Sequence, residues 1–120
     1  MDRLMAAAGA QPLDWNFKTE CCGAAFSVTR TDLVARMSGR IVADAVRHGA
    51  EAIVVACPMC QSNLDMRRPE INRELGADHQ VPVIFITQAL GLAMGLDPVA
   101  LGLQRHLVPA LSLQPAAAKA

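Results

Sequence analysis

The four cysteines of this sequence fall into two close pairs, and thiols are the groups here best suited to do chemistry. Cys21 and Cys22 are adjacent in the stretch ECCG, and Cys57 and Cys60 form a Cys-x-x-Cys motif in the stretch ACPMC. Thiolates at such spacings bind zinc, hold iron–sulfur clusters or form a redox-active disulfide. We therefore expect one site built from both pairs.

Four interpretations of the cysteines are open. They could fill the core as small apolar residues, act as a metal-free dithiol, bind zinc or hold an iron–sulfur cluster. Zinc sites of four cysteines usually combine two Cys-x-x-Cys motifs, so the adjacent pair favours an iron–sulfur cluster. Gly23 gives the backbone after the first pair the freedom to turn, and Pro58 stiffens the turn that presents the second pair.

The predicted strands place both pairs at one edge of a sheet. Residues 13–17 alternate in polarity as a strand does, and residues 52–56 show the continuous apolar pattern of a strand buried on both faces. Each segment leads toward one cysteine pair. A predicted helix over 31–48 is long enough to connect two parallel strands. Because ligand sites form beyond the carboxyl ends of parallel strands, we expect the four thiols to converge there.

The remaining patterns complete an α/β fold. They predict a third strand over 81–86 and further helices over 2–8, 59–75, 87–96 and 98–106, with a kink or new turn at Pro69. Strands alternating with helices indicate a three-layer-like α/β domain with a small, mostly parallel sheet, crossover helices and a metal site at the carboxyl ends of the strands. We expect one domain over residues 1–110 and a flexible C-terminal tail over 111–120.

Composition excludes several classes of function. The 120 residues include 11 Lys plus Arg and 11 Asp plus Glu, so no net charge attracts nucleic acid. No apolar run approaches the roughly 18 residues that span a bilayer. Neither a Ser, His and Asp arrangement for hydrolysis nor a glycine-rich phosphate loop is present. We expect a cytoplasmic protein, since clustered cysteines in a reducing compartment more often bind metal than form disulfides.

Three stretches carry a resemblance to a known family: KTECCG, the Thr-Arg pair before the predicted helix over 31–48, and IVVACPMCQSNLD. Over residues 1–106 the sequence resembles the cysteine-rich (CCG) domain of the B-type subunit of heterodisulfide reductase, in particular the second, C-terminal copy of that domain. Related domains occur in iron–sulfur subunits of glycolate and lactate oxidation and in thiol:fumarate reductase.

The resemblance implies a redox function. It implies a non-cubane [4Fe–4S] cluster, or in some family members a zinc ion, held by Cys21, Cys22, Cys57 and Cys60. Electrons from a partner iron–sulfur subunit would then reduce a disulfide, or thiols would be oxidised in the reverse direction. With four thiolates, an ordinary [4Fe–4S] cluster is also open. The alternative is a zinc-binding structural or interaction module without redox activity.

The chain departs from the family pattern in two ways. It lacks the family's further cysteine before the adjacent pair, and it lacks the first copy of the domain. The chain therefore resembles the C-terminal piece of a longer subunit, the product of a split gene, or a reduced descendant of such a subunit. We expect it to associate with another heterodisulfide reductase-like iron–sulfur subunit, with a missing N-terminal CCG domain, or with itself.

Other residues are candidates to support the site, and no catalytic residue is predicted beyond the metal ligands. Hydrogen bonds and packing around the sulfurs tune such a site. The supporting candidates are Gly23, Pro58, Asn63, Thr87 and Gln88. For Thr87 and Gln88, capping of the following helix is an equally open interpretation. The three histidines are interpreted as non-ligating: His48, His79 and His106.

Overall fold

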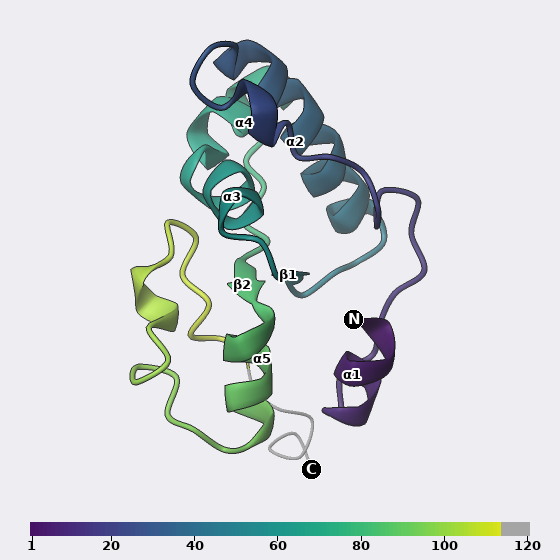
Figure 1. Ribbon diagram of the computed structural model, residues 1–120, viewed down its shortest axis with the longest axis vertical. Helices are drawn as coiled ribbons and strands as arrows, with labels where there is room; N and C mark the ends of the chain where they lie inside the picture. The colour runs from purple at the N-terminus through teal and green to yellow at the C-terminus, as the bar shows by residue number, and fades with distance from the viewer. Residues whose placement is uncertain (114–120) are drawn as a thin grey trace.

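Two short parallel strands lie at the centre of the molecule (Figure 1). The computed structural model describes residues 1–113. Within this part of the chain, β1 (Ile53–Val55) pairs with β2 (Val83–Phe85), with Ile53 opposite Val83 and Val55 opposite Phe85. The small parallel sheet expected from the sequence is therefore present, with two strands in the described residues.

Helices surround the strands. The α-helices are α1 (Asp2–Ala7), α2 (Thr31–Arg47), α3 (Pro58–Gln61), α4 (Arg68–Leu75) and α5 (Ile86–Ala93). Two 3₁₀ turns, η1 (Ala24–Phe26) and η3 (Leu103–Arg105), and one π-helical turn, η2 (Ser62–Met66), complete the elements. The expected helices over 2–8, 31–48 and 87–96 are confirmed to within a few residues.

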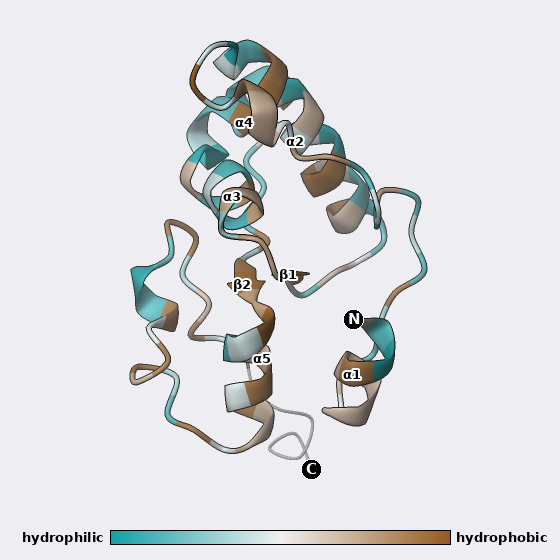
Figure 2. Cartoon of the chain, viewed as in Figure 1, coloured by the Kyte–Doolittle hydropathy of each residue, from teal (hydrophilic) through white to brown (hydrophobic). Residues whose placement is uncertain are grey.

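Both faces of the sheet are covered, which gives three layers. On one face, Ile53, Val55 and Val83 pack with buried residues of α2 and α4 in the α2-side core, which contains Cys22, Ile41, Val42, Ala45, Ile53, Val55, Leu64, Ile71, Val81 and Val83. On the other face, Val54 packs against the α5-side core, which contains Ile84, Leu92, Leu103 and Ala110. Figure 2 colours both strands as hydrophobic. Burial on both faces explains the continuous apolar runs in the sequence.

The strand expected over residues 13–17 is wrong. The segment is irregular and ends in a turn over residues 16–19. A strand needs a neighbour to satisfy its backbone, and here the Asn16 N–H donates to the Asp44 carboxylate on α2 at 3.1 Å instead. Trp15 and Phe17 still pack on the α2-side core. The alternating polarity therefore reflects one-sided packing against α2, and α2 does not connect two strands of the sheet.

The helix expected over residues 98–106 is also wrong. A single turn follows Asp97, whose carboxylate accepts the Ala100 N–H at 2.9 Å. Gly102 then adopts the left-handed conformation with φ 75°, which ends the turn before the short η3 begins. Gly102 was the sequence signal against a continuous helix.

The helix expected over residues 59–75 is divided into α3, η2 and α4. The kink or new turn expected at Pro69 lies close to the start of α4. Pro69 lies in the first turn of α4, where its missing N–H is tolerated. The π-helical turn widens the backbone by one residue per turn, and such turns often occur at functional sites. Asn63, Leu64 and Asp65, all within this turn, are buried.

No helix among residues 1–113 combines the length and apolar character that crossing a bilayer requires. Most of the tail expected over residues 111–120 lies outside the described residues, since the description ends at Leu113.

Candidate metal centre

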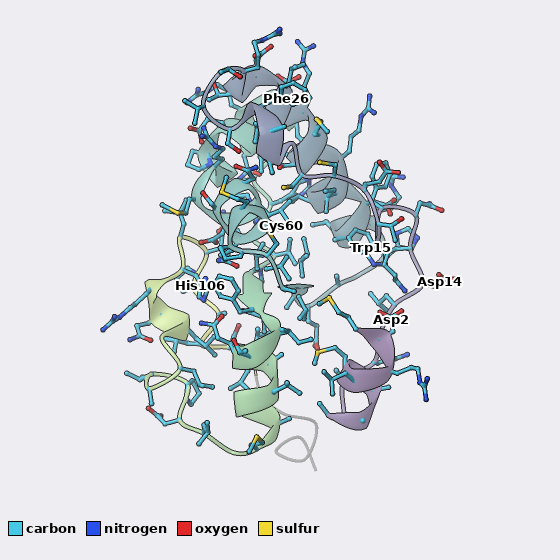
Figure 3. The ribbon with its side chains drawn as sticks, viewed as in Figure 1. Asp2, Asp14, Trp15, Phe26, Cys60 and His106 are labelled. Atoms are coloured by element: carbon cyan, nitrogen blue, oxygen red, sulfur yellow. The ribbon has the colours of Figure 1, made fainter. Side chains whose placement is uncertain are left out.

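The four cysteines differ in exposure. Cys22 is 3% exposed and belongs to the α2-side core, while Cys60 is partly buried against it. Cys21 and Cys57 are exposed, and all four are free thiols. Figure 3 labels Cys60 on α3, above the sheet. Each pair therefore offers one exposed thiol and one that is at least partly buried.

The second pair is positioned by the start of α3. Cys57 follows β1 and occupies the N-cap of α3, and Pro58 is the first helical residue. The backbone N–H groups of Cys60 and Met59 lower the pKa of Cys57, because they stabilise its thiolate. Burial, followed by the neighbouring Cys22, raises the pKa of Cys60 to about 12. The exposed thiol of this motif is therefore the more readily ionised one.

Cys60 joins the two pairs. Its thiol interacts with Cys22 from the first pair and with Cys57 from its own motif. The sulfur of Cys21 accepts a hydrogen bond from the Gly23 N–H at 3.3 Å. The pKa of Cys60 is therefore influenced by one cysteine from each pair.

These contacts do not yet make a metal site. Within residues 1–113, no group of three or more His, Cys, Asp or Glu side chains is arranged to hold one metal ion. Two thiols interact when their sulfurs approach, whereas ligation requires every donor to face one point. The donor set, all sulfur, suits zinc or iron. The four-cysteine site and its position at the strand ends remain predictions.

Gly23 is needed where it stands for two reasons. Its φ of 90° lies in the left-handed region, which side chains other than glycine rarely adopt. A Cβ atom there would lie 3.3 Å from Met37 Sδ and 3.3 Å from the Val34 Cα. Gly23 therefore allows the first cysteine pair to approach α2 closely.

We expect the Gly23→Ala variant to lose about 1–3 kcal/mol of unfolding free energy, because the backbone strain at positive φ and the crowding of the new Cβ against α2 both destabilise the fold. Gly76→Ala is the matched control, since Gly76 has φ 60° with nothing within 4 Å of its Cβ position. The control should lose about 1–2 kcal/mol from backbone strain alone. Urea denaturation measures both values, and equal losses would show that crowding against α2 is absent.

Asn63 is the one supporting candidate that contacts a cysteine sulfur through its side chain. Its Nδ2 lies 3.5 Å from Cys22 Sγ and 3.0 Å from Ser27 Oγ, and Asn63 is fully buried. Ser38 Oγ donates to the Cys22 carbonyl at 2.8 Å. Nothing in the sequence pointed to Ser27 or Ser38, because an isolated serine carries no spacing signal.

Thr87 and Gln88 are placed differently. Thr87 is exposed. Gln88 Oε1 accepts the Phe85 N–H at 2.9 Å, and its Nε2 donates to the Leu101 carbonyl at 2.9 Å. Gln88 therefore caps α5, which was the second interpretation of this residue, and it ties α5 to the C-terminal segment.

The sequence gives His106 no role beyond that of a non-ligating histidine, but in the structure both of its ring nitrogens contact glutamine side chains. Its Nδ1 lies 2.6 Å from Gln61 Nε2, and its Nε2 lies 3.0 Å from Gln88 Oε1. The only sequence signal was that Gln61 directly follows Cys60.

In the reduced, metal-free protein, we expect Cys57 to react with iodoacetamide at least about tenfold faster than Cys60. Burial raises the pKa of Cys60 to about 12, whereas the backbone N–H groups of Cys60 and Met59 lower the pKa of Cys57, so near neutral pH Cys57 holds far more thiolate. The greater nucleophilicity of the more basic thiolate offsets about half of this difference on a logarithmic scale. Tandem mass spectrometry of the peptide containing both residues gives each rate, and equal rates would contradict the expectation.

Known proteins share the part of the sequence that contains both cysteine pairs. The cysteine-rich domain family (CCG) matches residues 1–65. The B-type subunit of the ferredoxin:CoB-CoM heterodisulfide reductase of Methanosarcina mazei is 34% identical over 109 residues, which cover 89% of this chain and 36% of that protein. The corresponding subunit of the ferredoxin/F420H2-dependent CoB-CoM heterodisulfide reductase of Methanosarcina acetivorans is also 34% identical, with the same two shares covered.

A third relative is the 8-methylmenaquinol:fumarate reductase membrane anchor subunit of Wolinella succinogenes. It is 28% identical over 112 residues, which cover 93% of this chain and 39% of that protein. The chain spans somewhat more than a third of the length of these relatives. Because the family match covers more than half of the chain and includes both cysteine pairs, the protein belongs to the CCG cysteine-rich domain family.

Proposed function

We propose that the protein is an iron–sulfur redox domain related to the B-type subunit of heterodisulfide reductase, which transfers electrons to or from a disulfide or thiol substrate within a multi-subunit complex. The observation that carries this proposal is the position of Cys60, whose thiol interacts with both Cys22 and Cys57. The two Methanosarcina relatives support it, since both are named as heterodisulfide reductases.

In this proposal, Cys21, Cys22, Cys57 and Cys60 hold a [4Fe–4S] cluster, which supplies one-electron chemistry when bound. The chain's own residues set the surroundings of the sulfurs. Asn63 donates to the Cys22 sulfur, and the N-terminal N–H groups of α3 stabilise the Cys57 thiolate. The exposed Cys57 and Cys21 lie where a substrate can approach, while Cys22 anchors the site in the core.

The overall reaction would take up two electrons and two protons per disulfide and release two thiols. The electrons would come from another iron–sulfur subunit, or through a further CCG domain. Apolar side chains available for such a contact are exposed on this domain: Phe26, Val28, Met59, Met66, Met94, Leu96, Val99 and Leu107. We place the complex in the cytoplasm, where thiols stay reduced.

Metal and sulfide analysis of the full chain, purified without oxygen, tests the proposal. We expect about four iron and four sulfide per chain, with a broad brown visible absorption. Zinc at about one per chain, with no sulfide, would replace the redox proposal with the zinc-binding structural module. Absence of both metals would reject both functions.

A further inference from the structure

His106 is held on both ring nitrogens by glutamines from two different helices. Its side chain is 8% exposed and comes from the segment that follows η3 (Figure 3). Gln61 from α3 lies against Nδ1 at 2.6 Å, and Gln88 from α5 lies against Nε2. A histidine that serves only to fill space does not need two such partners.

The hydrogen bonds determine where the neutral ring carries its proton. In this orientation of Gln61 its amide nitrogen Nε2 faces the ring and donates, so Nδ1 of the neutral ring is the accepting nitrogen. The proton is then on Nε2. The partners of Gln88 at Phe85 and Leu101 fix its amide, and both amide atoms lie near His106 Nε2, with Nε2 at 2.9 Å and Oε1 at 3.0 Å. Oε1 is the atom that can accept a proton carried on His106 Nε2.

Gln61 leaves one buried atom without a partner. Gln61 is 8% exposed, and its Oε1 is buried without a hydrogen-bond partner among the described residues. Buried amide oxygens are normally paired. If the amide turned by half a revolution, Oε1 would face His106 Nδ1 and could accept a hydrogen bond there once Nδ1 carries a proton. The orientation of Gln61 is therefore tied to the protonation of His106.

A buried carboxylate lies beside the same ring nitrogen. Asp65 Oδ2 is 3.9 Å from His106 Nδ1, and Asp65 is 1% exposed. The backbone N–H groups of Leu107 and Val108 donate to its two oxygens at 2.8 and 3.1 Å, which stabilises the carboxylate anion.

Water can reach this cluster. Gln61, Asp65, Gln88, Arg105 and His106 line a hollow of about 500 Å³. Asp65 and Arg105 are the charged residues that line it beside His106, while α3 and α5 contribute uncharged glutamines. The hollow supplies a route for a proton from solvent to Nδ1.

We propose that His106 is a proton-binding residue linked to the cysteine site through Gln61. In the neutral state His106 carries one proton on Nε2 and accepts from Gln61 at Nδ1. A proton from solvent then binds Nδ1, the ring becomes an imidazolium, and the Gln61 amide turns to present Oε1. One proton enters and none leaves, so one positive charge is gained. Because Gln61 directly follows Cys60 in α3, the change acts on the redox site; this last link rests on the proposed function.

Nitrogen-15 NMR of the full chain tests the proton-binding residue directly. At alkaline pH we expect the Nε2–H tautomer for His106. As the pH falls, the Gln61 side-chain amide signals should shift with the same midpoint as the His106 ring. An Nδ1–H tautomer, or Gln61 signals that do not move while His106 titrates, would overturn the proposal.

Two variants sharpen this test. Gln61→Leu should weaken the tautomer preference of His106, because the donor to Nδ1 is gone while Gln88 still contacts Nε2. His79→Gln is the matched control, since His79 contacts its neighbours through its backbone, and it should leave both titrations unchanged. If Gln61→Leu does not fold, the proposal is tested in the unaltered protein alone, by whether the Gln61 amide and the His106 ring titrate with the same midpoint.

The link to the cysteine site has its own measurement. In metal-loaded protein, the midpoint potential should depend on pH across the His106 titration, and His106→Gln should remove that dependence. A midpoint potential that does not change with pH in the unaltered protein would show that His106 is not coupled to the cysteine site. If no redox metal binds at all, the proposed function fails, and the NMR experiment still decides whether His106 and Gln61 form a proton-linked pair.

Discussion

Replacing Cys60 by serine is expected to lower the bound metal to less than about one tenth of that in the unaltered chain. Cys60 is the residue whose thiol interacts with a cysteine from each pair, so its loss divides the donor set. A serine hydroxyl is a poor substitute for a soft thiolate ligand. Iron, sulfide and zinc analysis of both proteins, purified without oxygen, gives the ratio. Cys57→Ser should give the same result.

Met59→Leu is the matched control for these variants. Met59 lies between Cys57 and Cys60 and is 40% exposed, so this substitution changes the same turn without removing a thiol. Its metal content should equal that of the unaltered chain. If Cys60→Ser and Cys57→Ser also retained full metal content while remaining folded, these thiols would not be ligands.

The sequence predicted those parts of the fold that depend on local pattern. The helix over 31–48 has apolar residues at helical spacing and forms as α2, and the two apolar runs form β1 and β2. A buried strand is recognisable because burial on both faces leaves a continuous apolar run. Both cysteine pairs are recognisable from their spacing, and Cys22 and Cys57 both raise the pKa of Cys60, while their role as ligands stays a prediction.

What the sequence did not predict depends on distant partners. Residues 13–17 have the alternation of a strand, yet no strand lies beside them among the described residues, and Asp44 satisfies the Asn16 N–H instead. The contact of His106 with Gln61 spans 45 positions and has no periodicity to reveal it. Local sequence patterns indicate which segments form helices or strands and which faces are buried. Hydrogen bonds between single polar side chains far apart in the sequence are determined only by the packed tertiary structure.

Arg68→Met is expected to lower the free energy of unfolding by about 3–5 kcal/mol. Arg68 is 2% exposed, and its guanidinium donates to the carbonyls of Leu64, His79 and Val81 at 2.8–3.2 Å. Burial lowers its pKa, and the nearby Asp65 opposes that shift. Methionine fills similar space but removes the guanidinium donor from all three carbonyls, and the His79 carbonyl keeps only the Asn72 amide at 3.4 Å as a side-chain donor. Because a domain of this size has a total stability of about 5–15 kcal/mol, a large part of the protein's stability is at stake.

The same guanidinium joins the end of η2 to the chain leading into β2, so its loss should loosen the turn that carries Asn63 and Asp65. Arg73→Met on α4 is the matched control, since Arg73 is exposed, and it should change stability by less than about 0.5 kcal/mol. Arg68→Lys should recover only part of the loss, because one ammonium cannot reach three carbonyls in the planar fork of a guanidinium. Denaturant unfolding of the four proteins compares them. A loss for Arg68→Met no larger than that of Arg73→Met would mean that water replaces the guanidinium at these carbonyls, and that η2 is held by apolar packing of Leu64 and Ile71 instead.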